Sequence, residues 1–331
     1  MGRAVLLVPG DIETRTGGYI YDKRMVAALR AHGWRVDVRT SDLAAIPDDT
    51  IAIVDGLALV TLGDEIVRHA ARLRLAVLVH LPLGLEPGLD VAEAERRDAL
   101  EREALRLARL AIATGRRTVD ALASRGVRRV VLVEPGTDSA PRARGSHADR
   151  VALVAVAALT SGKGHEPLLR ALAAVPATNW SLTCAGSLDR DPATTARVRS
   201  LVGELGLADR VTLAGELDDR QLADLYDRSD VVVSASVRET YGMATAEAIA
   251  RALPVVATDV GEARAIAGDG GLLVPPGEHG ALADALTRVI TDADVRACLR
   301  ERAAVSRTRL RTWDEASRTL ADALAGLDAD D

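Results

Sequence analysis

The feature that most constrains the fold is an alternation of short apolar runs with helix-like segments along almost the whole chain. Short runs rich in valine, isoleucine and leucine are typical of strands buried on both faces of a parallel sheet, and the segments between them have the 3.6-residue period of helices. In the first half, the predicted strands are 4–9, 35–40, 51–59, 75–81, 110–114 and 130–136. The second half repeats the pattern, with predicted strands at 151–159, 180–186, 210–215, 230–236, 254–259 and 271–277.

This alternation predicts the α/β class, with two doubly wound parallel sheets of the Rossmann-like kind in tandem. Residues 139–150 (SAPRARGSHADR) break the pattern with proline, glycine, serine and arginine, so we interpret them as an interdomain linker. We therefore expect an N-terminal domain over residues 1–140 and a C-terminal domain over residues 151–310. A helical tail follows.

Composition excludes several classes of protein. The longest apolar run, 151–159, is far shorter than the roughly 20 residues that span a bilayer. The N-terminus has no pattern of a signal peptide, so we expect a cytoplasmic protein without a transmembrane segment. A net charge of −6 and an aromatic content of 2% argue against nucleic-acid binding. Cys184 and Cys298 lie far apart and have no metal-ligand spacing.

Ligands of doubly wound sheets bind at the carboxyl ends of the strands, which directs attention to the segments that follow them. Gly17 and Gly18 open a helix after the first strand, where backbone N–H groups favour an anion. Lys163 stands in a glycine-flanked turn after 151–159, where an ammonium group could hold a diphosphate. Neither G-x-G-x-x-G nor a P-loop motif occurs, which argues against a nicotinamide enzyme and a P-loop NTPase.

The stretch RETYGMATAEAIA, residues 238–250, carries two glutamates eight positions apart. We place Glu239 in a loop after the strand 230–236, and Glu247 inside a helix that begins beyond Gly242. The free N–H groups at this helix start could cradle a phosphate. Carboxylates accept hydrogen bonds from paired hydroxyls, so the two glutamates are predicted to hold different parts of one sugar-containing ligand.

These motifs resemble the family 4 glycosyltransferases, which are retaining enzymes with the GT-B fold. The most specific element is the E-x7-E pattern with an inner aromatic-Gly, here Glu239-Thr-Tyr241-Gly242 through Glu247. The segments TGG, GWRVDV, LVHLPL, VEPGTD, KGHEPLLRAL, ARALPVVATDVG and GDGGLLVPPGE also fit in order over nearly the whole chain. The resemblance implies two Rossmann-like domains facing a cleft, with a C-terminal helix over 311–331 that packs back on the N-terminal domain.

The resemblance also implies an activity and a set of site residues. The enzyme would move a sugar, with retention of configuration, from a nucleoside-diphosphate sugar to an acceptor hydroxyl, without a metal or another cofactor. We take UDP as the working nucleotide; the sequence leaves the base and the sugar open. His80 and Glu239 would be the catalytic residues. The other donor-binding residues would be Gly17, Gly18 and Lys163 at the phosphates, Tyr241, Gly242 and Met243 at the phosphate and sugar, Glu247 at the ribose, and Glu216 and Leu217 at the base.

The sequence departs from the family pattern at one phosphate-binding position. Ala158 and Gly162 stand where many relatives carry an arginine, and Arg190 is our hypothetical substitute. The acceptor site is expected in the N-terminal domain, around Tyr19, Tyr21, Leu81 and Leu83. The acceptor itself is left open between a saccharide, a lipid and a small metabolite, which leaves room for peripheral contact with a membrane.

Three alternatives compete with this interpretation. Asp189-Arg-Asp191 matches the short Asp-x-Asp signature of metal-dependent transferases, but Asp191-Pro192 also fits the start of a helix. His80 could be a structural histidine at a strand end. The whole chain could instead be a nucleotide-sugar epimerase, or a catalytically weak nucleotide-sugar-binding subunit, on the same fold.

Overall fold

The computed structural model describes residues 2–86 and 88–327. The chain divides into two units, each with its own sheet and core. Unit 1 combines Met1–Gly136 with Arg311–Asp331, and unit 2 is Thr137–Leu310. The last residues of the predicted terminal helix, 328–331, lie outside the described part of the chain.

Unit 1 is built on a six-stranded parallel sheet in the order β2-β1-β3-β4-β5-β6. The order of strand addition reverses between β1 and β3, because β2 lies on one side of β1 and the later strands lie on the other. Ligands of such sheets bind at the carboxyl ends of the two strands where this reversal occurs. The strands are β1 (Arg3–Leu7), β2 (Arg35–Arg39), β3 (Ile51–Asp55), β4 (Arg74–Val79), β5 (Leu110–Ala113) and β6 (Val130–Leu132). The helices are α1 (Gly17–Ala31), α2 (Leu59–His69), α3 (Val91–Leu107), α4 (Arg116–Ser124) and α12 (Trp313–Ala325).

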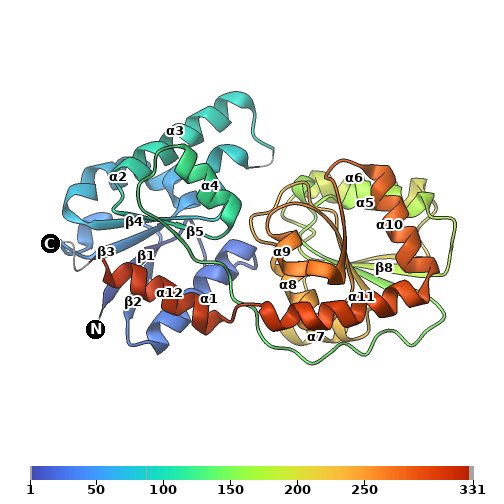
Figure 1. Cartoon of the computed structure of the whole chain (residues 1–331). Coiled ribbons are helices and arrows are strands. Elements are labelled where there is room, and N and C mark those ends of the chain that lie inside the picture. The colour runs from blue at the N-terminus through green and yellow to red at the C-terminus, as the bar shows by residue number, and fades with distance from the viewer. Residues whose placement is uncertain (1, 87, 328–331) are drawn as a thin grey trace. The chain divides into compact units, whose positions relative to one another are not determined.

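Helices cover both faces of this sheet, and successive strand residues enter different cores. Ala4 and Leu6 pack in the core beneath α1 and α12, whereas Val5 and Leu7 pack in the core beneath α2, α3 and α4. Figure 1 shows α1 and α12 on one side of the strands and α2 to α4 on the other. Residues far apart in sequence therefore share one core, and α12 lies against α1.

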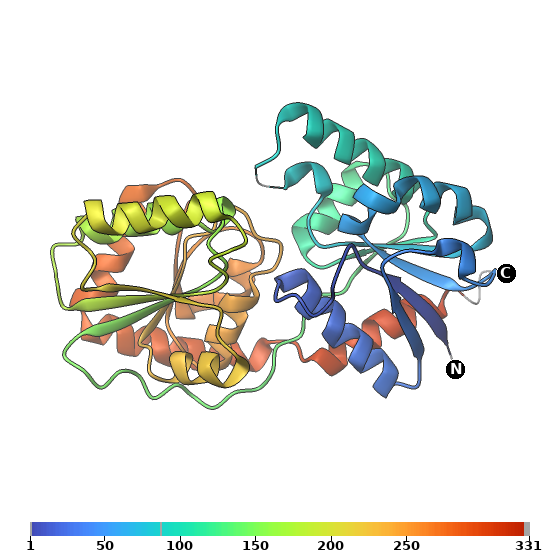
Figure 2. The ribbon, with the colours of Figure 1, turned by 180° about the vertical axis from the view of Figure 1, so that it is seen from behind.

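Unit 2 has a six-stranded parallel sheet in the order β12-β11-β10-β7-β8-β9, with its reversal between β7 and β10. The strands are β7 (Val151–Val156), β8 (Trp180–Ala185), β9 (Val211–Gly215), β10 (Val231–Ser234), β11 (Val255–Thr258) and β12 (Gly271–Val274). The helices are α5 (His165–Ala174), α6 (Pro192–Glu204), α7 (Asp219–Asp227), α8 (Met243–Ala250), α9 (Ala263–Ala267), α10 (His279–Thr291) and α11 (Ala293–Ser306). One core lies under α5, α6 and α10, and the other under α7, α8 and α9. Helix α11 contributes to both, with Leu299 in the first core and Ala303 in the second. Figures 1 and 2 show these helices around the sheet from opposite sides.

The predicted fold class is confirmed, because both sheets are parallel and doubly wound. The strand predicted over 51–59 is wrong beyond Asp55. The Asp55 carboxylate accepts a hydrogen bond from the Leu57 backbone N–H at 2.7 Å, and this turn starts a short 3-10 helix that leads into α2. The apolar run continues after Asp55, but Ala58 and Leu59 reach the core from the 3-10 helix and the start of α2. None of the helices in the described residues is long and apolar enough to cross a membrane.

Residues 139–150, which the sequence predicts to be a linker, lie within unit 2. The stretch has no regular secondary structure, yet it is held by hydrogen bonds along its length. The Ala143 N–H donates to the Arg251 carbonyl at 2.9 Å, and the Ser146 hydroxyl donates to Asp230 at 2.6 Å. Both views show it running along unit 2 (Figures 1 and 2). The polar and small residues of this stretch therefore belong to a surface segment that is hydrogen-bonded to unit 2, and they do not form a free interdomain linker.

Candidate functional site

Two loops of unit 2 meet at the carboxyl ends of β7 and β10. Gly164 has a φ of +70°, and a Cβ at this position would lie 1.8 Å from the carbonyl oxygen of Ala235. The Val237 N–H also donates to the carbonyl of Gly162 at 2.9 Å. Only glycine allows both this backbone conformation and this approach. The glycine therefore brings the loop that carries Lys163 against the loop that carries Glu239.

Lys163 and Glu239 form the polar centre of this junction. The Lys163 ammonium donates to the Glu239 carboxylate with a nitrogen–oxygen distance of 2.6 Å, and the same oxygen accepts from the Ser236 hydroxyl at 2.9 Å. The two side chains are 33% and 21% exposed, so both remain accessible from solvent. Together with His165, Gly242 and Thr245 they line a pocket.

The N-terminus of α8 opens beside Glu239. Gly242 is the N-cap with a φ of +102°, and no side chain caps the helix. The Ala246 N–H is the first to bond within the helix, to the Gly242 carbonyl at 3.1 Å. The N–H groups of residues 243–245 therefore point out of the helix, where the helix dipole favours an anion. The loop and glycine that the sequence predicts here are present.

Glu247 contacts a different partner from Glu239. Its carboxylate accepts a hydrogen bond from the Tyr226 hydroxyl at 2.8 Å, and the guanidinium of Arg251 lies 4.6 Å from the centre of the Tyr226 ring. Burial raises the pKa of the Glu247 carboxyl, although the Tyr226 hydrogen bond and Arg251 act in the opposite direction. Tyr226 and Ser236 were not identified from the sequence, because neither belongs to the spaced motif.

Three other predicted donor-site residues follow neighbouring strands of the sheet. Arg190 and Glu216 are exposed after β8 and β9, and Leu217 is half-buried against the core. Asp191 caps α6: its carboxylate accepts from the Thr194 N–H at 2.9 Å, and Pro192 occupies the first helical turn. The interpretation of this dipeptide as a helix start is confirmed.

In unit 1, the two predicted glycines begin α1. Thr16 is the N-cap and accepts a hydrogen bond from the Tyr19 N–H at 3.1 Å. A Cβ on Gly18 would lie 3.4 Å from the His80 imidazole, so this glycine faces the ring at contact distance. The structure therefore brings Gly18 and His80 together at the carboxyl edge of the unit 1 sheet.

His80 lies beside two carboxylates that no sequence motif marks, and beside the predicted acceptor residue Tyr21. Its Nε2 atom lies 3.4 Å from an oxygen of Asp22 and 3.8 Å from an oxygen of Asp55, and the edge of Tyr21 meets its ring. Burial raises the pKa of Asp55 to about 7. Burial lowers the pKa of His80, but the two carboxylates outweigh it, and the net shift is upward. Asp55 could have been found from its place at the end of an apolar strand, whereas nothing in the sequence of α1 marks Asp22.

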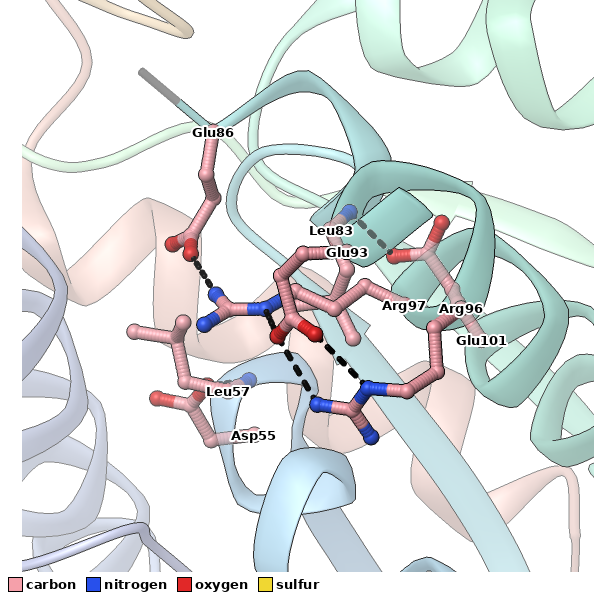
Figure 3. Close-up of polar contacts among 8 residues, drawn as sticks. All are labelled: Asp55, Leu57, Leu83, Glu86, Glu93, Arg96, Arg97 and Glu101. Carbon is pink, nitrogen blue, oxygen red and sulfur yellow. Dashed lines mark hydrogen bonds and ion pairs between the residues drawn. The ribbon is translucent and has the colours of Figure 1, made fainter. Parts of the chain in front are cut away.

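The loop after His80 is bound by one carboxylate and one guanidinium of α3, as Figure 3 shows. Glu101 is buried and accepts a hydrogen bond from the Leu83 N–H at 3.1 Å. Arg97 pairs with Glu86 on this loop and with Glu93 on its own helix, the latter at 2.6 Å. These contacts hold the segment that follows β4 in one conformation.

The structure places two predicted acceptor residues in the core of unit 1. Tyr21 is 1% exposed and its hydroxyl donates to the Val133 carbonyl at 3.0 Å, while Leu83 is also 1% exposed. Both side chains pack in the core, because the helix α1 and the loop after β4 turn them inward. Tyr19 and Leu81 are only partly buried.

Known proteins resemble this chain in sequence. The family model described as glycosyl transferases group 1 matches residues 137–305. The chain is 34% identical over 165 residues to a D-inositol 3-phosphate glycosyltransferase of Xylanimonas cellulosilytica, a match over 49% of this chain and 39% of that protein. It is 29% identical over 158 residues to the alpha-D-kanosaminyltransferase of Streptomyces kanamyceticus, over 47% of this chain and 40% of that protein. These matches span about two fifths of the curated relatives.

Solved structures resemble the chain over nearly its full length. Sucrose-phosphate synthase from Thermosynechococcus elongatus has a TM-score of 0.85 at 23% identity, with 100% of both chains covered. HepE of Anabaena, solved in complex with UDP and glucose, has a TM-score of 0.79 at 20% identity, over 98% of this chain and 100% of that one. These likenesses confirm the GT-B fold class.

Proposed function

Because the chain belongs to the group 1 glycosyl transferases, we propose that it transfers a sugar from a nucleoside-diphosphate sugar to an acceptor hydroxyl. The proposal includes retention of configuration at the anomeric carbon, in keeping with the resemblance to family 4. The nucleotide we propose is UDP, because HepE was solved with UDP. The names of the sequence relatives make inositol phosphate the first acceptor to test.

One observation carries the proposal: the free N-terminus of α8 lies beside the Lys163–Glu239 pair at the reversal point of the unit 2 sheet. This place combines N–H donors and an ammonium group, which suit a diphosphate, with a carboxylate, which suits sugar hydroxyls. We propose that the diphosphate is held by these groups without a metal ion.

In the proposed reaction, binding of the donor first separates Lys163 from Glu239, and each then contacts a different part of the donor. In the structure, the Lys163 ammonium pairs with Glu239. A bound diphosphate would accept hydrogen bonds from Lys163, and Glu239 would then accept them from hydroxyls of the donor sugar. As the glycosidic bond breaks, negative charge grows on the departing diphosphate. Lys163 and the N–H groups at residues 243–245 stabilise that charge. The acceptor hydroxyl attacks from the same face and passes its proton to an oxygen of the departing diphosphate.

The remaining assignments follow the predicted roles. Glu247 is proposed to bind the ribose hydroxyls, where its present partner Tyr226 shows that a hydroxyl group can donate to it. Glu216 and Leu217 are proposed at the base, and Arg190 as a further cation for the phosphates. In unit 1, Gly17, Gly18 and His80 are proposed to serve the reaction, and Tyr19 and Leu81 the acceptor.

A product assay tests the proposal directly. The purified chain is incubated with UDP-sugars, with and without inositol phosphate and a panel of saccharide and lipid acceptors, and UDP release and product are both measured. We expect UDP release that depends on the acceptor, and a product whose linkage keeps the α configuration of the donor. Donor turnover that is equal without any acceptor would indicate an epimerase or hydrolase and would refute transfer.

A binding assay separates the donor from the acceptor question. Thermal unfolding with a panel of nucleoside diphosphates should show a stabilisation by UDP, since a ligand of the folded state raises its stability by mass action. Stabilisation by UDP without transfer to any acceptor would favour a nucleotide-sugar-binding subunit.

A further inference from the structure

Tyr226, near the end of α7, holds the carboxylate of Glu247 from α8. Its side chain is 1% exposed and packs in the same core as the buried face of α8. Its hydroxyl donates to the Oε2 atom of Glu247 at 2.8 Å. A buried phenol normally needs such a partner, so we expect this bond to persist when a nucleotide binds.

The other carboxylate oxygen of Glu247 is left for a ligand. Glu247 is half-buried, and within residues 2–86 and 88–327 its Oε1 atom has no hydrogen-bond partner. A carboxylate oxygen has two lone pairs, so this one atom can accept hydrogen bonds from two neighbouring hydroxyls. It therefore suits the diol of a ribose.

The hydrogen bond from Tyr226 also fixes the plane of the carboxylate. Rotation about the last bond of a glutamate side chain is only weakly restricted, so a carboxylate without a partner adopts many orientations. With Oε2 held by a buried hydroxyl, Oε1 points in one direction before a ligand arrives. The side chain is then ordered during folding, and ligand binding does not have to supply that free energy.

Arg251, which follows α8, restrains the tyrosine in turn. Its guanidinium lies 4.6 Å from the centre of the Tyr226 ring and is attracted to the ring face. Its Nη1 atom donates to the Glu247 backbone carbonyl at 3.0 Å, and its own carbonyl accepts from the Ala143 N–H at 2.9 Å. Contacts from α7, α8 and the segment 139–150 therefore support the position of Glu247.

Tyr226 also favours the ionised form of Glu247. Burial has the largest effect and raises the pKa of this carboxyl, and Asp138 and Asp219 act in the same direction. The Tyr226 hydrogen bond and then Arg251 lower the pKa. A protonated carboxyl would use one oxygen as a donor and lose part of its capacity to accept. Orientation and charge state thus depend on the same hydroxyl.

We propose that Tyr226 is a positioning residue for the nucleotide ribose, and that through Glu247 it makes the site selective for ribonucleotides over 2′,3′-dideoxynucleotides. The inference rests on the proposed function, in which Glu247 binds the ribose. Tyr226 does not touch the ligand, because its hydroxyl is bonded to the carboxylate that does. Loss of this hydroxyl should weaken the contacts to the ribose and spare those to the phosphates and the base.

Calorimetry with two ligands tests the inference on the full chain. UDP and 2′,3′-dideoxy-UDP differ only in the ribose hydroxyls, so the ratio of their dissociation constants isolates the effect of these groups. We expect the parent protein to bind UDP at least about tenfold more tightly, which is the effect of a hydrogen bond to a charged group. Tyr226→Phe should reduce this preference to about threefold or less, through weaker binding of UDP. Glu247→Ala gives the ratio without the carboxylate.

The pH dependence of the ratio is a second readout. The preference for UDP should be present above the pKa of Glu247 and should be lost as the pH falls through it. In Tyr226→Phe the loss should occur at higher pH, because a hydrogen bond that lowers the pKa is gone. The same pH profile in both proteins would contradict the inference.

A matched control comes from another contact between a hydroxyl and a glutamate in unit 2, Ser200 with Glu204 at 2.8 Å on the exposed side of α6. Ser200→Ala should keep the full preference for UDP. If Tyr226→Phe weakens both nucleotides equally, or leaves their ratio unchanged, the positioning role is overturned while the proposed function stands. If the parent protein itself binds both nucleotides equally, the ribose role of Glu247 is refuted, and the inference with it.

Circular dichroism shows whether Tyr226→Phe is folded. Arg251→Gln is the second variant if it is not. This change releases the tyrosine ring and should also lower the preference for UDP, and a preference equal to that of the parent protein would count against the inference.

Discussion

At the scale of single residues, Glu239 and Glu247 are separated by what they contact. Glu239 lies in a loop with Lys163 and Ser236, whereas Glu247 lies in α8 with Tyr226. Gly242 lies between them and starts the helix whose free N–H groups face the same region. The two carboxylates therefore do not share a proton or a partner, which argues against a general acid–base pair.

Replacing Glu239 should affect transfer much more than stability. Glu239→Gln keeps the size of the side chain and removes its charge, so hydrogen bonds to sugar hydroxyls weaken. We expect kcat/KM to fall more than tenfold, which corresponds to about 1.4 kcal/mol or more of transition-state stabilisation. Glu278→Gln, at an exposed position of the same unit, is the control and should retain full activity. Near-normal turnover of Glu239→Gln in folded protein would reject its catalytic role.

Arg190 is our hypothetical substitute for the phosphate-binding arginine that the family pattern leads us to expect at Ala158 or Gly162. Its side chain is exposed and forms no hydrogen bond or ion pair within the described residues, so it is available to a phosphate. Arg190→Ala should weaken UDP binding about tenfold by calorimetry, the effect of losing one charge-assisted contact. Arg199→Ala is the control: it removes an exposed charge from the nearby helix α6 and should leave the affinity for UDP unchanged. If both variants bind UDP as the parent does, the substitution hypothesis is wrong.

Sequence patterns locate site residues best where a motif fixes the backbone. Gly164 beside Lys163 and Gly242 after Glu239 predicted their loops, and both have a positive φ in the structure. Asp22 escaped notice, since a single acid in a helix normally faces solvent. Tyr21 was predicted at the acceptor site together with Tyr19, but the turn of α1 directs it into the core. Burial of one helix face is a tertiary property that local spacing does not reveal.

At the scale of elements, the turn before α5 holds two loops of unit 2 together. A Cβ at Gly164 would meet the Ala235 carbonyl at 1.8 Å, whereas a Cβ at Gly277 would meet nothing within 4 Å. Both glycines have positive φ, +70° and +84°. The comparison of the two positions separates backbone strain from steric overlap.

Gly164→Ala should therefore destabilise unit 2 more than Gly277→Ala. Strain alone costs an alanine roughly 1–2 kcal/mol in this conformation, and the overlap at Gly164 adds to it. We expect urea unfolding to show a loss of at least about 3 kcal/mol for Gly164→Ala. UDP binding should weaken as well, because the Lys163 loop must move. Equal losses at the two positions would contradict the close approach of the loops.

Element types were predictable from the sequence, and element ends were less so. Every predicted strand is present, and most are continuous apolar runs, as expected of strands buried on both faces of a parallel sheet. The edge strands β2 and β9 alternate between buried and more exposed residues instead. The run 51–59 was extended too far, since a buried helix start reads like a buried strand. Residues 139–150 lack a hydrophobic pattern, so the hydrogen bonds that tie them to unit 2 could not be foreseen.

At the scale of the whole molecule, the chain forms two units that differ in whether one continuous segment of sequence builds them. Unit 2 is continuous in sequence, whereas unit 1 needs residues from both ends of the chain. Ala316, Leu320 and Leu324 of α12 are buried in the same core as Tyr21 and Leu29 of α1. Unit 1 is therefore complete only after the last helix has been synthesised, while unit 2 can fold earlier.

The two cores should respond separately to core substitutions. Leu320 lies in the α1–α12 core of unit 1, and Leu286 lies under α10 in unit 2. A buried leucine replaced by alanine loses about 2–5 kcal/mol of unfolding free energy. The three tryptophans allow each unit to be followed alone: Trp34 and Trp313 report on unit 1, and Trp180 is buried in unit 2. In a Trp180→Phe background, Leu320→Ala should lower the urea midpoint and Leu286→Ala should not. In a Trp34→Phe, Trp313→Phe background the order should reverse, whereas equal shifts for both substitutions in both backgrounds would mean that the chain unfolds as a single cooperative unit.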